Sequence, residues 1–138
     1  MSNTGINEKD GAWGRTALHW AAYNGLHGLV KALVKLDGIM INVRDDKNAT
    51  SLCYVAEHGH VATAKLLICR GAWLNVKDYD HFTPLHYAVR SGSIEMVELL
   101  LVHGADATAR DKAGNTPVLW AVMFNYTKIE RLLRKLEK

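Results

Sequence analysis

The chain has 138 residues, of which 49% are hydrophobic and 22% are charged, and its formal net charge is +3. This composition is ordinary for one globular domain with its own core, and it argues against both a largely disordered chain and a strongly basic nucleic-acid binder. No apolar run reaches the roughly 18 residues of a membrane helix, no signal segment stands at the N-terminus, and Cys53 and Cys69 are too few for a disulfide framework. We therefore expect a cytoplasmic protein with reduced thiols, with the nucleus as the alternative location.

The first ten residues, MSNTGINEKD, are polar and show no hydrophobic periodicity. Chain termini of this kind are poorly ordered unless something ties them down. We expect residues 1–10 to fray and the folded part of a single domain to begin near residue 11.

The rest of the chain repeats one pattern four times, as GRTALHWAAYNG, NATSLCYVAEHG, HFTPLHYAVRSG and GNTPVLWAVMFN. The threonines of these copies are 34, 33 and 33 residues apart, and aspartates stand five residues before the last three of them. A shared period of this length indicates a stack of supersecondary units. We expect four units, at about 11–44, 45–77, 78–110 and 111–138.

The repeated pattern predicts a short first helix in each unit. A threonine precedes it and is expected to accept hydrogen bonds from free backbone N–H groups at the helix start (Thr16, Thr50, Thr83 and Thr116). Pro84 and Pro117 follow at the first helical position, where a missing N–H costs nothing. The helix is expected to end at a residue in the left-handed conformation (Gly25, Gly59, Gly92 and Asn125).

A second helix follows in each unit. The first of these, at 26–36, carries few charges, which predicts an exposed apolar patch, and one extra residue near Leu36–Gly38 is expected to bulge its loop. In the last, at 128–138, the apolar residues Ile129, Leu132, Leu133 and Leu136 alternate with charged ones. One apolar face and one wet face predict a helix that caps the stack.

These motifs resemble the ankyrin repeat, a unit of turn plus two helices with the pattern T-P-L-H-x-A, over about nine-tenths of the chain. The resemblance implies an all-α repeat solenoid, with a turn or β-hairpin loop and two antiparallel helices per repeat. It also implies that His19 and His86 are structural, bonded to backbone and to the threonine of their own motif. Unit 2 departs furthest, with Cys53 for the histidine and Val55 for a small alanine, so we expect it to be the least stable layer.

Catalytic and metal-binding chemistry is not indicated. The seven histidines do not form a set of three or four converging ligands, and no nucleophile elbow, phosphate loop or dinucleotide motif occurs. We expect no enzyme activity, no metal, no cofactor and no small-molecule substrate.

Positions that differ between units are the candidates for recognition, because the repeated positions hold the fold. An aromatic residue that recurs in every unit is assigned to packing instead (Trp20, Tyr54, Tyr87 and Trp120). The variable positions on the tips and inner helices, which line the concave face in the ankyrin fold, carry a basic excess and irregular aromatics. The candidate partner-binding residues are Trp13, Arg15, Tyr23, Lys47, Glu57, Tyr79, Asp80, Phe82, Arg90, Lys112, Met123 and Phe124.

The resemblance implies a protein–protein interaction scaffold of the inhibitor or adaptor type, or a host-targeting effector. The basic and aromatic residues favour a partner protein with acidic and apolar contact residues. The alternatives are a nucleic-acid binder, which a steep salt dependence would reveal, and a purely structural repeat module. We expect a monomer, or weak self-association through the first outer helix.

Overall fold

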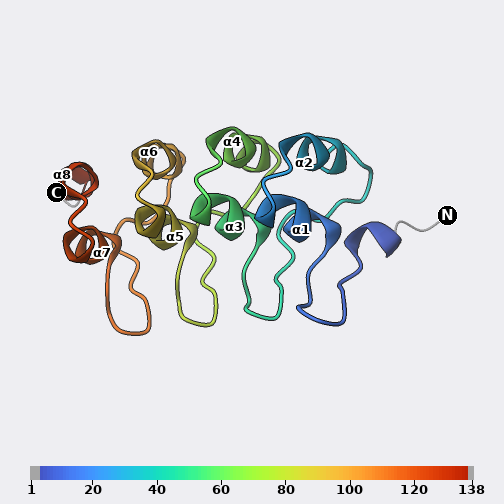
Figure 1. Cartoon of the computed structure of the whole chain (residues 1–138), viewed down its shortest axis with the longest axis horizontal. Helices are drawn as coiled ribbons and strands as arrows, with labels where there is room; N and C mark the ends of the chain where they lie inside the picture. The colour runs from blue at the N-terminus through green and yellow to red at the C-terminus, as the bar shows by residue number, and fades with distance from the viewer. Residues whose placement is uncertain (1–3, 137–138) are drawn as a thin grey trace.

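The computed structural model describes residues 4–136, and within them eight α-helices stand in two parallel rows (Figure 1). The inner row consists of α1 (Ala17–Tyr23), α3 (Ser51–Glu57), α5 (Pro84–Ser91) and α7 (Pro117–Met123). The outer row consists of α2 (His27–Leu33), α4 (Val61–Cys69), α6 (Ile94–Val102) and α8 (Thr127–Leu136). Each unit is one inner and one outer helix, and the predicted all-α repeat solenoid is confirmed.

Long loops extend from the inner row to the side away from the outer helices (Figure 1). Their ends, here called the tips, comprise residues 11–15, 45–49, 78–82 and 111–115. Adjacent tips are joined by one backbone hydrogen bond each, in which Asp46, Tyr79 and Lys112 donate to Trp13, Lys47 and Asp80 over 2.9–3.0 Å. No residue between 4 and 136 lies in a β-strand, and each tip contains a residue in the left-handed conformation (Gly14, Asn48, His81 and Gly114).

The inner helices begin as predicted in three of four units. The hydroxyls of Thr16, Thr83 and Thr116 accept from the backbone N–H three residues later. The prediction is wrong for Thr50, which precedes α3 without a side-chain cap. Its hydroxyl lies 3.6 Å from the sulfur of Cys53, the residue that replaces the histidine of the motif.

His19 and His86 join neighbouring units. In each, Nδ1 accepts from the backbone N–H of the preceding threonine over 3.1 Å. Because Nδ1 accepts, Nε2 carries the proton, and it donates to the carbonyl of Ala49 in one case and Asn115 in the other. Burial lowers the pKa of both imidazoles, so they are held neutral. The hydrogen bond from Nε2 to a carbonyl of the following unit is an additional contact, which the resemblance did not imply.

Residues 4–10 make defined contacts with the first unit, so the fraying of this segment stays a prediction, while residues 1–3 lie outside the described residues. A short 3₁₀ helix, η1 (Thr4–Asn7), leads to Asn7, whose amide donates to the Gly38 carbonyl over 2.8 Å and accepts from the Met40 N–H over 2.9 Å. Asn42 and Asn75 make the same pair of bonds to the next unit. The segment NEKD at 7–10 is therefore one more copy of NVRD at 42–45.

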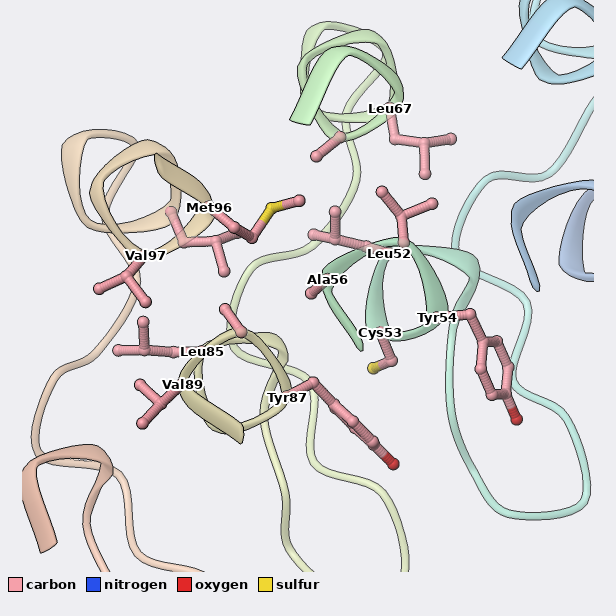
Figure 2. Close-up of a cluster of buried hydrophobic side chains, with 14 of the residues drawn as sticks. Leu52, Cys53, Tyr54, Ala56, Leu67, Leu85, Tyr87, Val89, Met96 and Val97 are labelled. Atoms are coloured by element: carbon pink, nitrogen blue, oxygen red, sulfur yellow. The ribbon is translucent and has the colours of Figure 1, made fainter. Parts of the chain in front are cut away.

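The core fills the space between the two rows (Figure 2). Leu52 of α3 points toward Leu67 of α4, Leu85 of α5 lies beside Val97 of α6, and Met96 of α6 points toward α3 and α4. Ala56 and Val89 lie on the sides of α3 and α5 that face the next inner helix, and all of these residues are fully buried. Tyr54 and Tyr87 point away from this layer toward the tips (Figure 2).

The two ends of the outer row differ. At the first, α2 stops at Leu33, and the extra residue is absorbed in turns over 34–38, leaving Leu26, Leu29 and Leu36 half exposed as the predicted apolar patch. At the other, α8 buries Ile129 and Leu133 and exposes Lys128, Arg131 and Lys135, so the helix has one apolar and one wet face, and its capping role stays a prediction. The side chain of Leu136 lies outside the described part of the chain.

Candidate functional site

Arg15 sits at the centre of a group of aromatic rings, here called the first cluster (Arg15, Trp13, Trp20, Tyr23 and Tyr54). Its guanidinium lies 4.7–5.5 Å from the centres of all four rings. It also lies 3.3 Å from the carboxylate of Asp45 and donates to the Tyr54 hydroxyl over 3.1 Å. Only 9% of Arg15 is exposed, so it supports the surrounding rings from within rather than presenting a charge to a partner.

The first cluster forms the wall of a pocket of about 400 Å³. The pocket is lined by Trp13, Arg15, Trp20, Tyr23, Lys47, Tyr54 and Glu57. Five of these residues, contributed by two units, were chosen from the sequence as variable, whereas Trp20 and Tyr54 were assigned to packing alone. Trp13 is 55% exposed and Tyr23 39%, so the rim of the pocket offers aromatic surface to solvent.

Arg90 occupies a similar group in unit 3, here called the second cluster (Arg90, Phe82, Tyr87 and Trp120). Its guanidinium lies 5.0–5.8 Å from the three ring centres and bonds to Glu57 of unit 2 over 2.5 Å. Phe82 packs edge-on against Tyr87 and Trp120, with ring centres 5.9 and 5.0 Å away. Phe82 is half-buried, and its contacts serve mainly to join units 3 and 4.

The two clusters use the same pair of positions with the residues exchanged. Arg15 and Phe82 both stand immediately before the motif threonine, and Tyr23 and Arg90 both stand seven residues after it. An arginine therefore packs on an aromatic ring in both of these units, at 4.8 Å in the first and 5.7 Å in the third.

The remaining candidates lie apart from the pocket. Tyr79, Asp80 and Lys112 are exposed on the tips of units 3 and 4. Met123 and Phe124 stand at the C-terminal end of α7, where Phe124 stacks on Tyr126 at 5.8 Å. The structure therefore divides the twelve predicted residues among the pocket, the second cluster, the tips of units 3 and 4, and the end of α7.

An aspartate beneath each tip holds the recurring aromatic residue, a contact that the sequence interpretation missed. Tyr54 donates to Asp45, Tyr87 to Asp78, and the Trp120 indole to Asp111 over 3.0 Å. Trp20 donates to Asp10 over 2.6 Å in the same way. Burial raises the pKa of both tyrosines, which keeps their hydroxyls as donors. The signal was present: this position always holds tyrosine or tryptophan, never phenylalanine, nine residues after the aspartate in three units.

Part of the predicted basic excess belongs to the fold. Arg44 donates to the Lys77 carbonyl and Lys77 to the Arg110 carbonyl, each in the next unit, over 3.4 and 3.2 Å. Arg15 and Arg90 are engaged in the clusters. The exposed charged residues that remain around the tips are Lys47, Arg110 and Lys112 against Asp46 and Asp80.

Two negative findings apply to residues 4–136. They contain no group of three or more histidine, cysteine, aspartate or glutamate residues placed to hold a metal ion. None of their helices combines the length and apolarity needed to cross a membrane.

Comparison with known proteins agrees with the geometry. A family model described as ankyrin repeats in three copies matches residues 1–78 and 74–138. The chain is also 37% identical over 71 residues to a transient receptor potential cation channel subfamily A member 1 homolog of Caenorhabditis elegans, a match that covers 51% of this chain and 6% of that protein. Because so little of that relative is spanned, this likeness bears on the repeats and not on the channel. Together with the paired helices, the family match shows that the chain belongs to the ankyrin-repeat family.

Proposed function

We propose that the chain is a non-enzymatic protein-recognition module that binds a partner protein on its tips and inner helices, with the pocket of the first cluster as the main contact. Ankyrin repeats are generally protein-interaction modules, and the finer assignment here is ours. The observation that carries it is the convergence of variable residues from two units on one pocket with exposed aromatic walls. Tryptophan, tyrosine and arginine dominate binding hot spots.

The chemistry of the pocket favours a partner with an apolar anchor next to acidic residues. Trp13 and Tyr23 supply exposed apolar surface, and Lys47 stands exposed beside them. Glu57 forms an ion pair with Arg90, so its negative charge is partly compensated. Such a module acts by occluding or tethering its partner, as an inhibitor or adaptor in the cytoplasm or nucleus, and a host-targeting effector would use the same surface.

Affinity capture followed by mass spectrometry tests the proposal. The paired substitution Trp13→Ala and Tyr23→Ala removes the exposed rings and leaves Arg15 with its bonds to Asp45 and Tyr54. We expect at least one protein that the wild-type chain captures to be reduced tenfold or more, the equivalent of about 1.4 kcal/mol.

Trp73 provides a matched control. It is as exposed as Trp13, at 56% against 55%, and lies in the connection after α4, outside the pocket. Trp73→Ala should leave capture unchanged, and circular dichroism should show that all variants are folded. Equal capture by the wild type and the paired variant, or equal losses with Trp73→Ala, would remove the pocket from the proposal.

A further inference from the structure

The far end of the inner row exposes apolar side chains at positions that are buried everywhere else. Leu119 and Val122 of α7 are 42% and 44% exposed, and Met123 beside them is 60% exposed. The residues equivalent to Leu119 and Val122 in the other three units are all 0% exposed (His19, Cys53, His86, Ala22, Ala56 and Val89). In those units the next inner helix covers them.

The two helices of unit 4 differ in the kind of side chain that they expose. α8 exposes the basic residues Lys128, Arg131 and Lys135. In α7, leucine, valine and methionine stand at 119, 122 and 123, one stripe along the helix. Solvation alone would favour polar residues at these positions, so the stripe indicates a surface that is covered in use.

The interfaces between units indicate the shape of what covers the stripe. α3 lies on α1, α5 on α3 and α7 on α5, so the free side of α7 has the form that receives a helix (Figure 1). Cys53, the counterpart of Leu119 in unit 2, is covered by α5 without a hydrogen bond to the following carbonyl, because it lacks the imidazole of His19 and His86. An apolar residue at this position is therefore compatible with a helix packed side by side on the inner helix.

Charge distinguishes between the possible sources of that helix. The described part of α8 carries four basic residues and one acidic one, Glu130, which is bonded to Arg134 over 2.9 Å. A second copy of the chain would bring either another α8, or Lys31 and Lys35 of α2, against this basic helix. Like charges brought together at an interface oppose both arrangements.

We propose that the stripe Leu119, Val122 and Met123, with the basic residues of α8 above it, is a docking site for an acidic amphipathic helix of another protein. This surface is separate from the pocket of the first cluster. A negative result for this docking site would leave the proposed function of the pocket unchanged, and the reverse also holds.

The probe is a synthetic helical peptide of about 18 residues, long enough to form a helix, with leucines on one face and glutamates on the other. A second peptide has lysine at every glutamate. Binding to the full chain is measured by fluorescence anisotropy and mapped by amide chemical shifts. We expect shifts confined to residues 117–135 and at least tenfold weaker binding of the lysine peptide.

Substitutions distinguish this site from the others. Leu119→Lys or Met123→Lys should weaken binding of the acidic peptide tenfold or more, and having both variants guards against one that misfolds. Leu29→Lys, at the equally exposed patch on α2, and Trp13→Ala with Tyr23→Ala should leave binding unchanged. Absence of binding, equal binding of both peptides, or shifts centred on α2 or the pocket would overturn the proposal. Sedimentation showing a dimer that Met123→Lys dissociates would assign the stripe to a second copy instead.

Discussion

The first and second clusters place an arginine and aromatic rings at the same two repeat positions, yet one is open and the other is closed. In the first, Arg15 lies inside, against Asp45, and the rings of Trp13 and Tyr23 face solvent. In the second, Phe82 lies inside, between Tyr87 and Trp120, and Arg90 lies outside against Glu57. The position before the threonine is the deeper one whichever residue fills it.

This difference shows that variation between repeats is not by itself evidence of a binding residue. Arg15 and Phe82 vary because each completes a local packing arrangement, and Trp13 and Tyr23 vary at the surface. The depth of a position in the stack therefore separates the candidates, and stability measurements on matched pairs can test that separation.

The largest expected effect is the difference in folding stability between the Arg15 and Arg90 variants. Arg15→Ala removes the partner of the buried Asp45 carboxylate and should destabilise the fold by about 3 kcal/mol, the cost of leaving a buried charge uncompensated. Arg90→Ala breaks a pair that is partly exposed on both sides and should cost about 1 kcal/mol or less. Urea denaturation measures both, and equal losses would remove the distinction between the clusters.

The next effect concerns the aromatic residues. Phe82→Ala removes a half-buried ring that contacts Tyr87 and Trp120 and should cost about 2 kcal/mol, below the 3–5 kcal/mol of a fully buried phenylalanine. Trp13→Ala removes an exposed ring and should change stability by no more than about 0.5 kcal/mol. The same denaturation series checks this, and a larger loss for Trp13 than for Phe82 would reverse our assignment of the two residues.

A smaller change in folding stability is expected with pH, because His19 lies next to the first cluster and His86 next to the second. Burial lowers the pKa of His19 and His86 below the ordinary value of 6.5, so the unfolded chain binds protons more readily than the folded one below that pH. Stability should be complete above about pH 6.5 and fall as the pH drops from there toward 5. In His19→Gln and His86→Gln the slope of stability against pH should be shallower, and an unchanged slope would show that other groups cause it.

The smallest effect is expected at the one ion pair that joins the two clusters. Glu57 lines the pocket of the first cluster and bonds to Arg90 of the second. A double-mutant cycle with Glu57→Gln and Arg90→Gln should give a coupling energy of about 0.5 kcal/mol, which falls as salt rises. No measurable coupling would mean that the clusters are energetically separate.

The repeat pattern was enough to predict the helices, because caps, prolines and left-handed glycines act within a few residues of the chain. Three features depended on contacts between units and were missed or wrong. Residues 4–10 are held by Asn7 and Asp10, but without a helix of their own they showed no hydrophobic period. The burial of Arg15 depends on Asp45, thirty residues away, and no local signal reports it. Thr50 makes no side-chain capping bond, and its hydroxyl lies 3.6 Å from the Cys53 sulfur, a departure that the motif does not encode.

The central claim is that a partner protein binds the pocket of the first cluster, and a hydrogen-exchange footprint of the complex tests it most directly. The partner is the captured protein that Trp13→Ala with Tyr23→Ala releases. Our account predicts slower exchange on binding in residues 11–15, 20–24 and 46–57, with little change in α4 and α6. Protection confined to the outer helices, or to α7 and α8 alone, would contradict it.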